Sequence, residues 1–319
     1  MAEHIELNYH EPLNLPSKYL RAVKNPNTTV IVDNNSEGDC WNHFLNLHVF
    51  YKKYNMDCRL VYLSGNFHVE SLYKKWLKQT SKPKLYSVKV YNIHFKTFAT
   101  HFRGNYASPK YKKKNFFCFL NNRQHSHRCQ SLVYMNYLKL LDKGKVSFRE
   151  IDRLSANQFM QRCMMPDILP KSVAKYIKDT ENKIPLHLDY VERVDKLQHS
   201  KPFDLNPKIY NSLVNLTSET FYHEPGLFLT EKIIKPMFAG QILILIGQKH
   251  SLQYLKTKGF KTFDSIIDES YDNMNNDKRM FAAMDQLKHL YENYTLEELN
   301  NITFKIRRHN FKVAQRVFK

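Results

Sequence analysis

Apolar residues follow two different spacings along this chain, and residues 230–247 show both in succession. Thr230 can cap a helix with its side-chain hydroxyl, and Gly240 can adopt the left-handed conformation that ends one. Between them, apolar side chains recur at helical spacing: Ile233, Ile234, Met237 and Phe238. Pro236 predicts that this helix is short or kinked, because proline interrupts the helical hydrogen bonds. The apolar run Ile242–Ile246 is typical of a strand covered on both faces, so the segment indicates α/β architecture.

The same two patterns recur along most of the chain. Strands are predicted at residues 28–33, 59–63, 84–91, 115–120, 145–148 and 212–217, and helices at 41–54, 71–79, 128–141, 278–294 and 297–319. The first two dozen residues predict an irregular lead-in, and residues 151–205 predict a helical insert broken by prolines. Two series of strand, loop and helix predict an α/β protein with two Rossmann-like domains.

A lysine-rich stretch after Pro109 marks the predicted boundary between these domains. We expect a first domain at residues 1–110, a second at 111–295, and a basic C-terminal helix at 296–319. The chain of 319 residues is long enough for two domains of ordinary size.

Apolar runs and cysteine usage indicate the cellular compartment of the protein. No N-terminal segment has the order of a signal peptide, and the longest apolar run, around residues 237–247, is too short to span a membrane. Five cysteines without a C-x-x-C pair indicate neither a disulfide framework nor a zinc ribbon. We therefore expect a cytoplasmic protein with reduced cysteines and no integral membrane segment.

The net charge of +19 calls for an anionic partner. No acid occurs between Ser71 and Leu141, where lysines and arginines are interleaved with aromatic residues, and none follows Glu298. This composition suits phosphate contacts and base stacking. The candidate nucleic-acid contacts are Lys110, Lys112, Lys113, Lys114, Arg307 and Arg308. The alternative for the lysine run is a solvated linker face.

Three segments carry a resemblance to a known family. Thr230-Glu231-Lys232, then Lys235-Pro236 and the strand that follows, resemble the nucleotide-sugar signature of GT-B glycosyltransferases, and most of all the fucosyltransferase-like group of phages and bacteria. Residues 251–272 are similar to the segment that follows this signature, and residues 119–128 resemble the group's strand that ends in an arginine-bearing loop. The resemblance covers most of residues 115–272 and nothing before residue 110.

The resemblance implies two Rossmann-like domains that face each other across a cleft. The first would bind the acceptor and the second a UDP- or GDP-linked sugar, with no bound cofactor, and the last helix commonly crosses back to the first domain. It also places the enzyme in a bacterial or phage-infected host cytoplasm.

A nucleotide sugar needs cations, a helix N-terminus and hydroxyl acceptors. Lys232 lies in the first helical turn, where it can meet phosphate, and Arg123 can approach with its forked donors. Glu231 and Glu219 can accept from ribose or sugar hydroxyls; the alternatives are a helix-dipole role for Glu231 and ordinary surface positions for the two cations. The candidate donor-binding residues are Asn121, Asn122, Arg123, Glu219, Thr230, Glu231, Lys232 and Lys235.

Other chemistries have weak support. The sequence has no D-x-D triplet, and His125 and His127 have no third metal ligand near them in sequence, so we expect metal-independent binding. No P-loop, G-x-G-x-x-G or Ser-His-Asp order stands out. Asp264, Asp268, Glu269 and Asp272 are interpreted as a solvated face.

An inverting transfer requires a carboxylate that deprotonates the acceptor hydroxyl. Asp39 is the first candidate and Glu37 the second, because both follow a predicted strand; a plain capping carboxylate is the alternative for each. The charge favours an acceptor in double-stranded DNA, a 5-hydroxymethylated pyrimidine. The alternatives are a surface glycan or lipopolysaccharide, and a non-catalytic nucleic-acid-binding protein on a GT-B-like fold.

Overall fold

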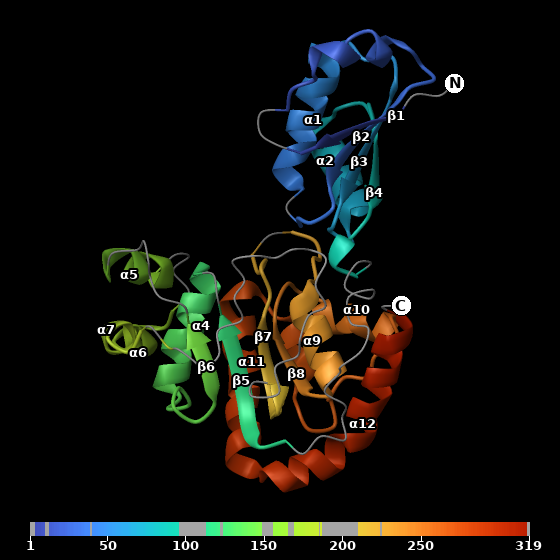
Figure 1. Cartoon of the computed structure of the whole chain (residues 1–319). Coiled ribbons are helices and arrows are strands. Elements are labelled where there is room, and N and C mark those ends of the chain that lie inside the picture. The colour runs from blue at the N-terminus through green and yellow to red at the C-terminus, as the bar shows by residue number, and fades with distance from the viewer. Residues whose placement is uncertain are drawn as a thin grey trace. The chain divides into compact units, whose positions relative to one another are not determined.

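A computed structural model describes residues 4–9, 13–38, 40–95, 113–121, 124–148, 156–164, 169–184, 186, 210–223 and 225–317. The chain forms two compact units (Figure 1). The first contains Met1–Lys96 together with His223–Leu229, and the second contains Thr97–Tyr222 and Thr230–Lys319. The predicted boundary after residue 110 and the observed division after Lys96 both fall in residues 96–112, which lie outside the described residues.

The first unit is built on a parallel sheet with strand order β1-β2-β3-β4. The strands are β1 His4–Asn8, β2 Thr29–Asn34, β3 Arg59–Ser64 and β4 Ser87–Val90. Helices α1 Trp41–Lys53 and α2 Val69–Thr80 cover one face of this sheet (Figure 1). Alternate residues of the strands pack under these helices, as Val30 and Val32 of β2 do against Phe44 and Leu47 of α1. The short 3-10 turns η1 Ser17–Tyr19 and η2 Ala22–Lys24 connect β1 to β2.

Strand β1 corrects the predicted irregular lead-in. His4–Asn8 pairs in parallel with β2, from His4 opposite Thr29 to Asn8 opposite Asp33, and Ile5 is buried. A five-residue edge strand is stabilised mainly by its neighbour, so its own sequence carries little periodic signal. The predicted strand at 84–91 is also shorter, because only Ser87–Val90 pairs with β3.

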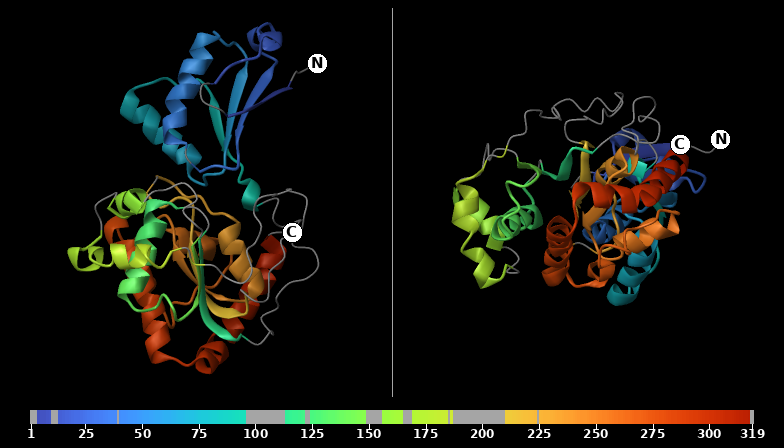
Figure 2. Two further views of the ribbon diagram at one scale, coloured as in Figure 1. Left: turned by 60° about the vertical axis from the view of Figure 1, so that its left-hand side comes forward. Right: turned by 90° about the horizontal axis from the view of Figure 1, so that it is seen from below.

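The second unit has a parallel sheet of order β6-β5-β7-β8 between two helical layers. Its strands are β5 Asn115–Asn121, β6 Lys145–Phe148, β7 Ser212–Ser218 and β8 Ile242–Ile246. Helices α4 Ser126–Tyr137 and α11 Asn276–Asn293 pack together, and α9 Glu231–Ala239 packs with α12 Leu296–Val317 (Figures 1 and 2). The remaining helices are α5 Ala156–Met164, α6 Lys171–Ala174, α7 Ile177–Glu181, α10 Ser251–Thr257 and η4 Glu269–Asn273. The predicted α/β class with two Rossmann-like units is confirmed.

Helix α9 forms as its sequence predicts. The Thr230 hydroxyl accepts the backbone N–H of Lys232, and Gly240 ends the helix with φ 59°. Pro236 lies inside this short helix without ending it, since the residues before it form only the first turns.

Two buried basic side chains hold the other end of α9. Lys113 donates to the carbonyl oxygens of Tyr210 (2.9 Å) and Ala239 (2.6 Å), and Arg307 of α12 donates to that of Gly240 (2.9 Å). Hydrogen-bond donors at a helix C-terminus are favourable, because the last carbonyls have no partner within the helix. Helix α12 therefore belongs to the second unit, where it fixes α9.

The segment His223–Leu229 leaves the second unit and packs into the first. Asn66, fully buried, donates to the carbonyl of Pro225 (3.2 Å) and accepts the N–H of Leu227 (3.0 Å). The Phe228 ring occupies the space that a side chain would need at Gly38 and Gly65, where a Cβ would lie 2.4 and 2.6 Å from it. Both positions thus require glycine, and they seat this segment at the carboxyl ends of β2 and β3.

Two smaller expectations concern the whole chain. In the described parts of the chain, no helix is long and apolar enough to cross a membrane. All five cysteines are buried and free.

Candidate functional site

The second sheet has a topological switch point between β5 and β7. From β5 the chain passes through α4 to β6 on one side, whereas from β7 it passes through α9 to β8 on the other. The two connections diverge at the carboxyl ends of β5 and β7, which is where ligands bind in open α/β sheets. The described strands of the first unit follow one another in order, so no such point occurs among them.

Unmet polar groups gather at this switch point. In the described part of the chain, neither amide atom of Asn121 has a hydrogen-bond partner, and the side chain is 5% exposed. The hydroxyl of Ser218 is buried without a partner as well. Asn121 ends β5 and Ser218 ends β7, and the pairing of Phe119 with Leu216 sets them side by side. Because buried polar groups in native proteins are nearly always bonded, we take Asn121 and Ser218, at a point where ligands bind in this kind of sheet, as a candidate ligand site.

Glu219 follows β7 and fixes the start of α9. Its carboxylate is fully buried and accepts the Thr230 N–H (2.9 Å) and the Thr230 hydroxyl (2.7 Å). The Thr230 oxygen in turn accepts Lys232 Nζ (3.0 Å), which also donates to the Thr220 hydroxyl (3.2 Å) and to Glu231 (3.3 Å). The side chains of Lys232 and Glu231 remain 29% and 21% exposed. The network therefore presents one ammonium and one carboxylate at the N-terminus of α9.

A stack of planar groups supports the same edge of the sheet. His127 stacks on Tyr222 (ring centroids 5.3 Å apart), and the Arg279 guanidinium lies 4.6 Å from the Tyr222 ring centre. Arg128 donates to the carbonyls of Ser218 (3.2 Å) and Glu219 (3.1 Å), and Arg279 donates to that of Gly247 (2.9 Å). Burial raises the pKa of Tyr222 to about 12, so its ring stays neutral. These contacts join the loops that follow β5, β7 and β8 into a rigid base.

The structure places five of the predicted donor residues at this edge: Asn121, Glu219, Thr230, Glu231 and Lys232. Glu219 is already bonded to Thr230, so its position is that of an anchor for α9. Lys235 lies in the second turn of α9 and is only 9% exposed. Asn122 and Arg123 lie outside the described residues. The sequence analysis did not identify Tyr222 and Arg279 as site residues, because neither lies in a recognisable motif. Only the fold brings Arg279 to the Tyr222 ring and to the Gly247 carbonyl.

Of the two predicted catalytic acids, Asp39 lies outside the described residues. Glu37 is exposed in the loop after β2, and its carbonyl accepts the N–H of Gly65 (3.1 Å). The loop is therefore held at the carboxyl end of the first sheet.

Two predicted nucleic-acid contacts are wrong. Lys113 is 4% exposed and Arg307 is fully buried, because both are used to bind the carbonyls at the end of α9. Lys114 and Arg308 are exposed, and Lys110 and Lys112 lie outside the described residues. Net charge along a sequence does not distinguish a capping cation from a surface one.

The predicted solvated face at residues 264–272 holds for Asp264 and Asp268, which are exposed, but not for Asp272 and Glu269. Asp272 is buried and accepts the N–H groups of Leu252 and Gln253 (3.1 Å each), so it caps α10. Burial raises its pKa. Glu269 accepts the Phe263 N–H (2.7 Å).

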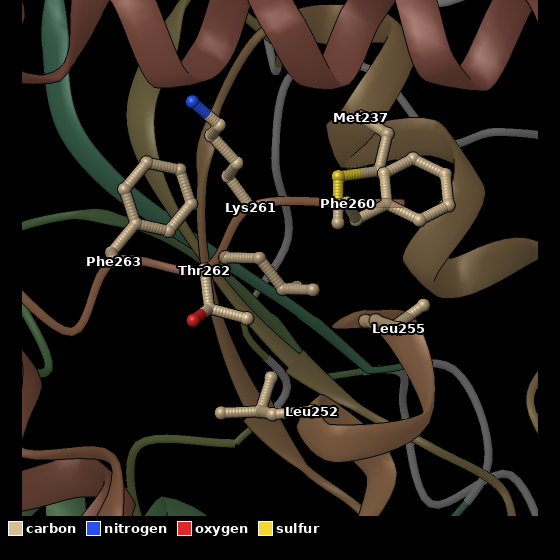
Figure 3. Close-up of a pocket in the computed structure, with 8 residues that line it drawn as sticks. Met237, Leu252, Leu255, Phe260, Lys261, Thr262 and Phe263 are labelled. Carbon is tan, nitrogen blue, oxygen red and sulfur yellow. The ribbon is translucent and has the colours of Figure 1, made fainter. Parts of the chain in front are cut away.

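A cavity beneath α10 is a packing defect of the core. It measures about 10 Å³ and is lined mainly by apolar side chains such as Met237, Leu255 and Phe260, together with Lys261 and Thr262 (Figure 3). This volume is below that of a ligand, so the cavity is not a substrate site. In the described residues, no group of three or more His, Cys, Asp or Glu side chains is placed to hold a metal ion.

The chain is similar to known solved structures only at low sequence identity. The chain matches no protein-family model and no curated protein. Its similar solved structures include T4 phage BGT in complex with its UDP-glucose substrate, at 11% identity and a TM-score of 0.43, over 98% of this chain and 78% of that one. The DNA-modifying enzyme beta-glucosyltransferase, solved with and without uridine diphosphoglucose, gives 11% identity and a TM-score of 0.42, over 99% of this chain and 78% of that one. A third structure, of T4 phage beta-glucosyltransferase, gives 12% identity and a TM-score of 0.39, over 91% of this chain and 70% of that one.

Proposed function

We propose that the protein is a glycosyltransferase of the GT-B class that binds a nucleotide sugar at the carboxyl ends of β5 and β7. The observation that carries this proposal is the pair of unmet polar side chains at the switch point, formed by Asn121 and Ser218. The motif resemblance of residues 115–272 to the fucosyltransferase-like group agrees with a nucleotide-sugar donor.

The diphosphate is assigned to the start of α9. A helix N-terminus carries partial positive charge, and Lys232 adds a full charge to it. Lys232 Nζ is held by two hydroxyl oxygens and by Glu231, so it is oriented before a ligand arrives. The Glu231 carboxylate lies beside this ammonium at the same helix end, and we assign it to a ribose hydroxyl of the donor.

The unmet pair at the strand ends suits hydroxyl groups better than phosphate. The Asn121 amide offers both a donor and an acceptor, and the Ser218 hydroxyl offers the same combination. Phosphate oxygens would satisfy the donors but would meet the Asn121 oxygen as a second acceptor. Sugar hydroxyls donate and accept together, so we place a hydroxyl-bearing ring of the donor on Asn121 and Ser218.

For the reaction, we propose an inverting, metal-independent transfer to a hydroxyl acceptor. A carboxylate must remove the acceptor proton while the bond to the nucleotide diphosphate breaks. Asp39 remains the first candidate for this base, and Glu37, in the loop after β2, is the second. The acceptor that we propose is a 5-hydroxymethylated pyrimidine in DNA, because the net charge of +19 favours a polyanion.

The first test is thermal stabilisation of the full chain by a panel of UDP- and GDP-linked sugars and bare nucleotides, with EDTA present. At a concentration 100 times the dissociation constant, a specific ligand stabilises the fold by about 2.7 kcal/mol. One or more nucleotide sugars should raise the melting temperature, and more than the matching bare nucleotide does. If no member of the panel shifts the transition, or if EDTA abolishes the shift, the proposed site or its metal independence is wrong.

A further inference from the structure

The exposed side of α12 carries four cations in one stripe. Lys305, Arg308, Lys312 and Arg316 recur every three or four residues and are all exposed. Within the described chain, none of the four makes an ion pair or a side-chain hydrogen bond. We call these four residues the α12 stripe. No acid follows Glu298 in the sequence, so this part of α12 supplies no carboxylate beside the stripe.

A neighbouring segment enlarges this basic surface. The backbone of Lys261 exchanges two hydrogen bonds with the Asn310 side chain (2.8 and 2.7 Å), and His309 bonds the carbonyl of Gly259 (2.9 Å). These contacts fix residues 259–261 against α12, and Lys258 and Lys261 are exposed there. Two acids of this region, Asp264 and Glu269, already pair with Lys256 (3.2 Å each).

The stripe leads toward the edge of the sheet that carries the candidate site. Arg307 binds Gly240 at the C-terminal end of α9, and Phe311, one turn later, contacts Phe238 (ring centroids 6.3 Å apart). Helix α12 thus continues along α9 in the direction of the Thr230 end, and its last turns lie beside α9 (Figures 1 and 2).

We propose that the α12 stripe binds the phosphate backbone of double-stranded DNA, which rests on the proposed DNA acceptor. At a rise of 1.5 Å per residue, Lys305 and Arg316 are about 17 Å apart along the helix, and their neighbours are spaced by about 4.5–6 Å. Duplex DNA places one charge per ~1.7 Å of its axis, so several phosphates lie within reach of such a row. The contact reads no base, because it addresses only the backbone.

The structure favours DNA over an anionic membrane surface. A helix that lies in a membrane interface needs an exposed apolar face beside its charges. The apolar face of α12 is buried in the second unit through Leu299, Val313 and Ala314, and among its described residues Ile302 is the one large apolar side chain that is strongly exposed. The exposed side is therefore suited to electrostatic contact without insertion.

The test compares two fourfold variants of the full chain that lose the same charge. In the stripe variant, Lys305, Arg308, Lys312 and Arg316 are replaced by Gln. In the control, Gln replaces four lysines that already pair with acids: Lys143, Lys178, Lys183 and Lys288. Affinity for a fluorescent duplex is measured from 50 to 200 mM salt, and binding to phosphatidylserine vesicles is measured alongside.

The logarithm of the DNA-binding constant falls with the logarithm of the salt concentration, with a slope of about −0.9 per phosphate contact. Loss of four contacts should therefore make this slope less steep by ~3.6. The wild-type affinity should then fall about 150-fold more than that of the stripe variant over this fourfold salt range. The control should keep the wild-type slope. Equal slopes for wild type and stripe variant, equal loss in both variants, or stripe-dependent binding to vesicles rather than to DNA would overturn the proposal.

Nucleotide-sugar stabilisation, measured on the same samples, separates the two proposals. The stripe variant should keep the wild-type melting shift, because none of its four positions belongs to the candidate donor site. A stripe-dependent DNA slope without any nucleotide-sugar shift would reject the proposed donor site and leave the DNA surface standing. The reverse result would reject only the surface.

Discussion

Replacing Asn121 by Leu should stabilise the protein and weaken its donor binding at the same time. The two side chains share the same branched heavy-atom skeleton, but Leu has no polar atoms. In the described part of the chain, both amide atoms of Asn121 are buried and have no hydrogen-bond partner in the protein, so the fold itself does not offset their desolvation penalty. A ligand that bonds both atoms would remove this penalty on binding.

The magnitude follows from the cost of an unsatisfied buried polar group, which is about 1–3 kcal/mol. Asn121→Leu should therefore raise the free energy of unfolding by about 1–3 kcal/mol, with a melting temperature higher by roughly 2–4 °C per kcal/mol. The affinity for the nucleotide sugar should fall by about 10–100-fold, because two hydrogen bonds to its hydroxyl groups are lost.

The assay combines urea denaturation with calorimetric titration of the nucleotide sugar that stabilises the wild type. Asn215→Leu is the matched control on the adjacent strand β7. Asn215 is equally buried, but it donates to Gln241 (3.0 Å) and accepts from Thr217 (2.8 Å). Its loss leaves partners unsatisfied, so the control should be destabilised.

The reasoning fails if Asn121→Leu is destabilised as strongly as Asn215→Leu, since Asn121 would then have a structural role. It also fails if the variant is stabilised but binds the donor with wild-type affinity. In that case the unmet amide would not belong to the ligand site.

Three further predictions concern other parts of the molecule. Lys232→Ala should weaken nucleotide-sugar binding by about 1.5–3 kcal/mol, because a charged hydrogen bond to phosphate is lost. The control Lys256→Ala, at an exposed position of α10, should bind the nucleotide sugar like the wild type. Equal affinities of the two variants in calorimetric titration would refute the phosphate assignment. Burial, then the nearby Arg307, lowers the pKa of Lys113 from 10.5 to about 7. Between those pH values the unfolded chain holds the proton that the folded one has released, so unfolding free energy should rise with pH by up to about 1.4 kcal/mol per unit relative to Lys113→Met. A pH-independent difference between the two denaturation series would contradict the lowered pKa. Asp39→Asn should reduce turnover ~10²–10⁴-fold and spare donor binding, with Glu37→Gln as comparison; if both variants turn over normally, the base lies elsewhere.

Local signals explain which elements the sequence predicts well. The strand Ile242–Ile246 has both predicted bounds, because the apolar run and the glycines beside it are features of the segment itself. The predicted helix at 128–141 instead ends at Tyr137, because Lys139 adopts a left-handed φ of 58°. A lysine does not predict this conformation, which usually falls on glycine or asparagine. Strand β1 was missed for the reason that its stability comes from β2.

The candidate site was predicted in part for the same physical reason. Thr230, Glu231 and Lys232 are consecutive, so a helix N-terminus with its charges can be read from the sequence. Ser218 and Asn121 come together only through the register of β5 and β7, and Arg279 reaches the site from α11. Neither relation leaves a periodic or motif signal.

The central claim is that the switch point of the second unit binds a nucleotide sugar for transfer. The most direct measurement is transfer of radiolabel from UDP- and GDP-linked sugars, in EDTA, to DNA containing 5-hydroxymethylcytosine, with unmodified DNA and a lipopolysaccharide extract alongside. We predict label in the hydroxymethylated DNA with the wild type and at least a tenfold lower yield at limiting donor with Asn121→Leu. Label in the polysaccharide alone would reject the DNA acceptor, and no transfer from any donor, or equal transfer by both proteins, would contradict the account of the site.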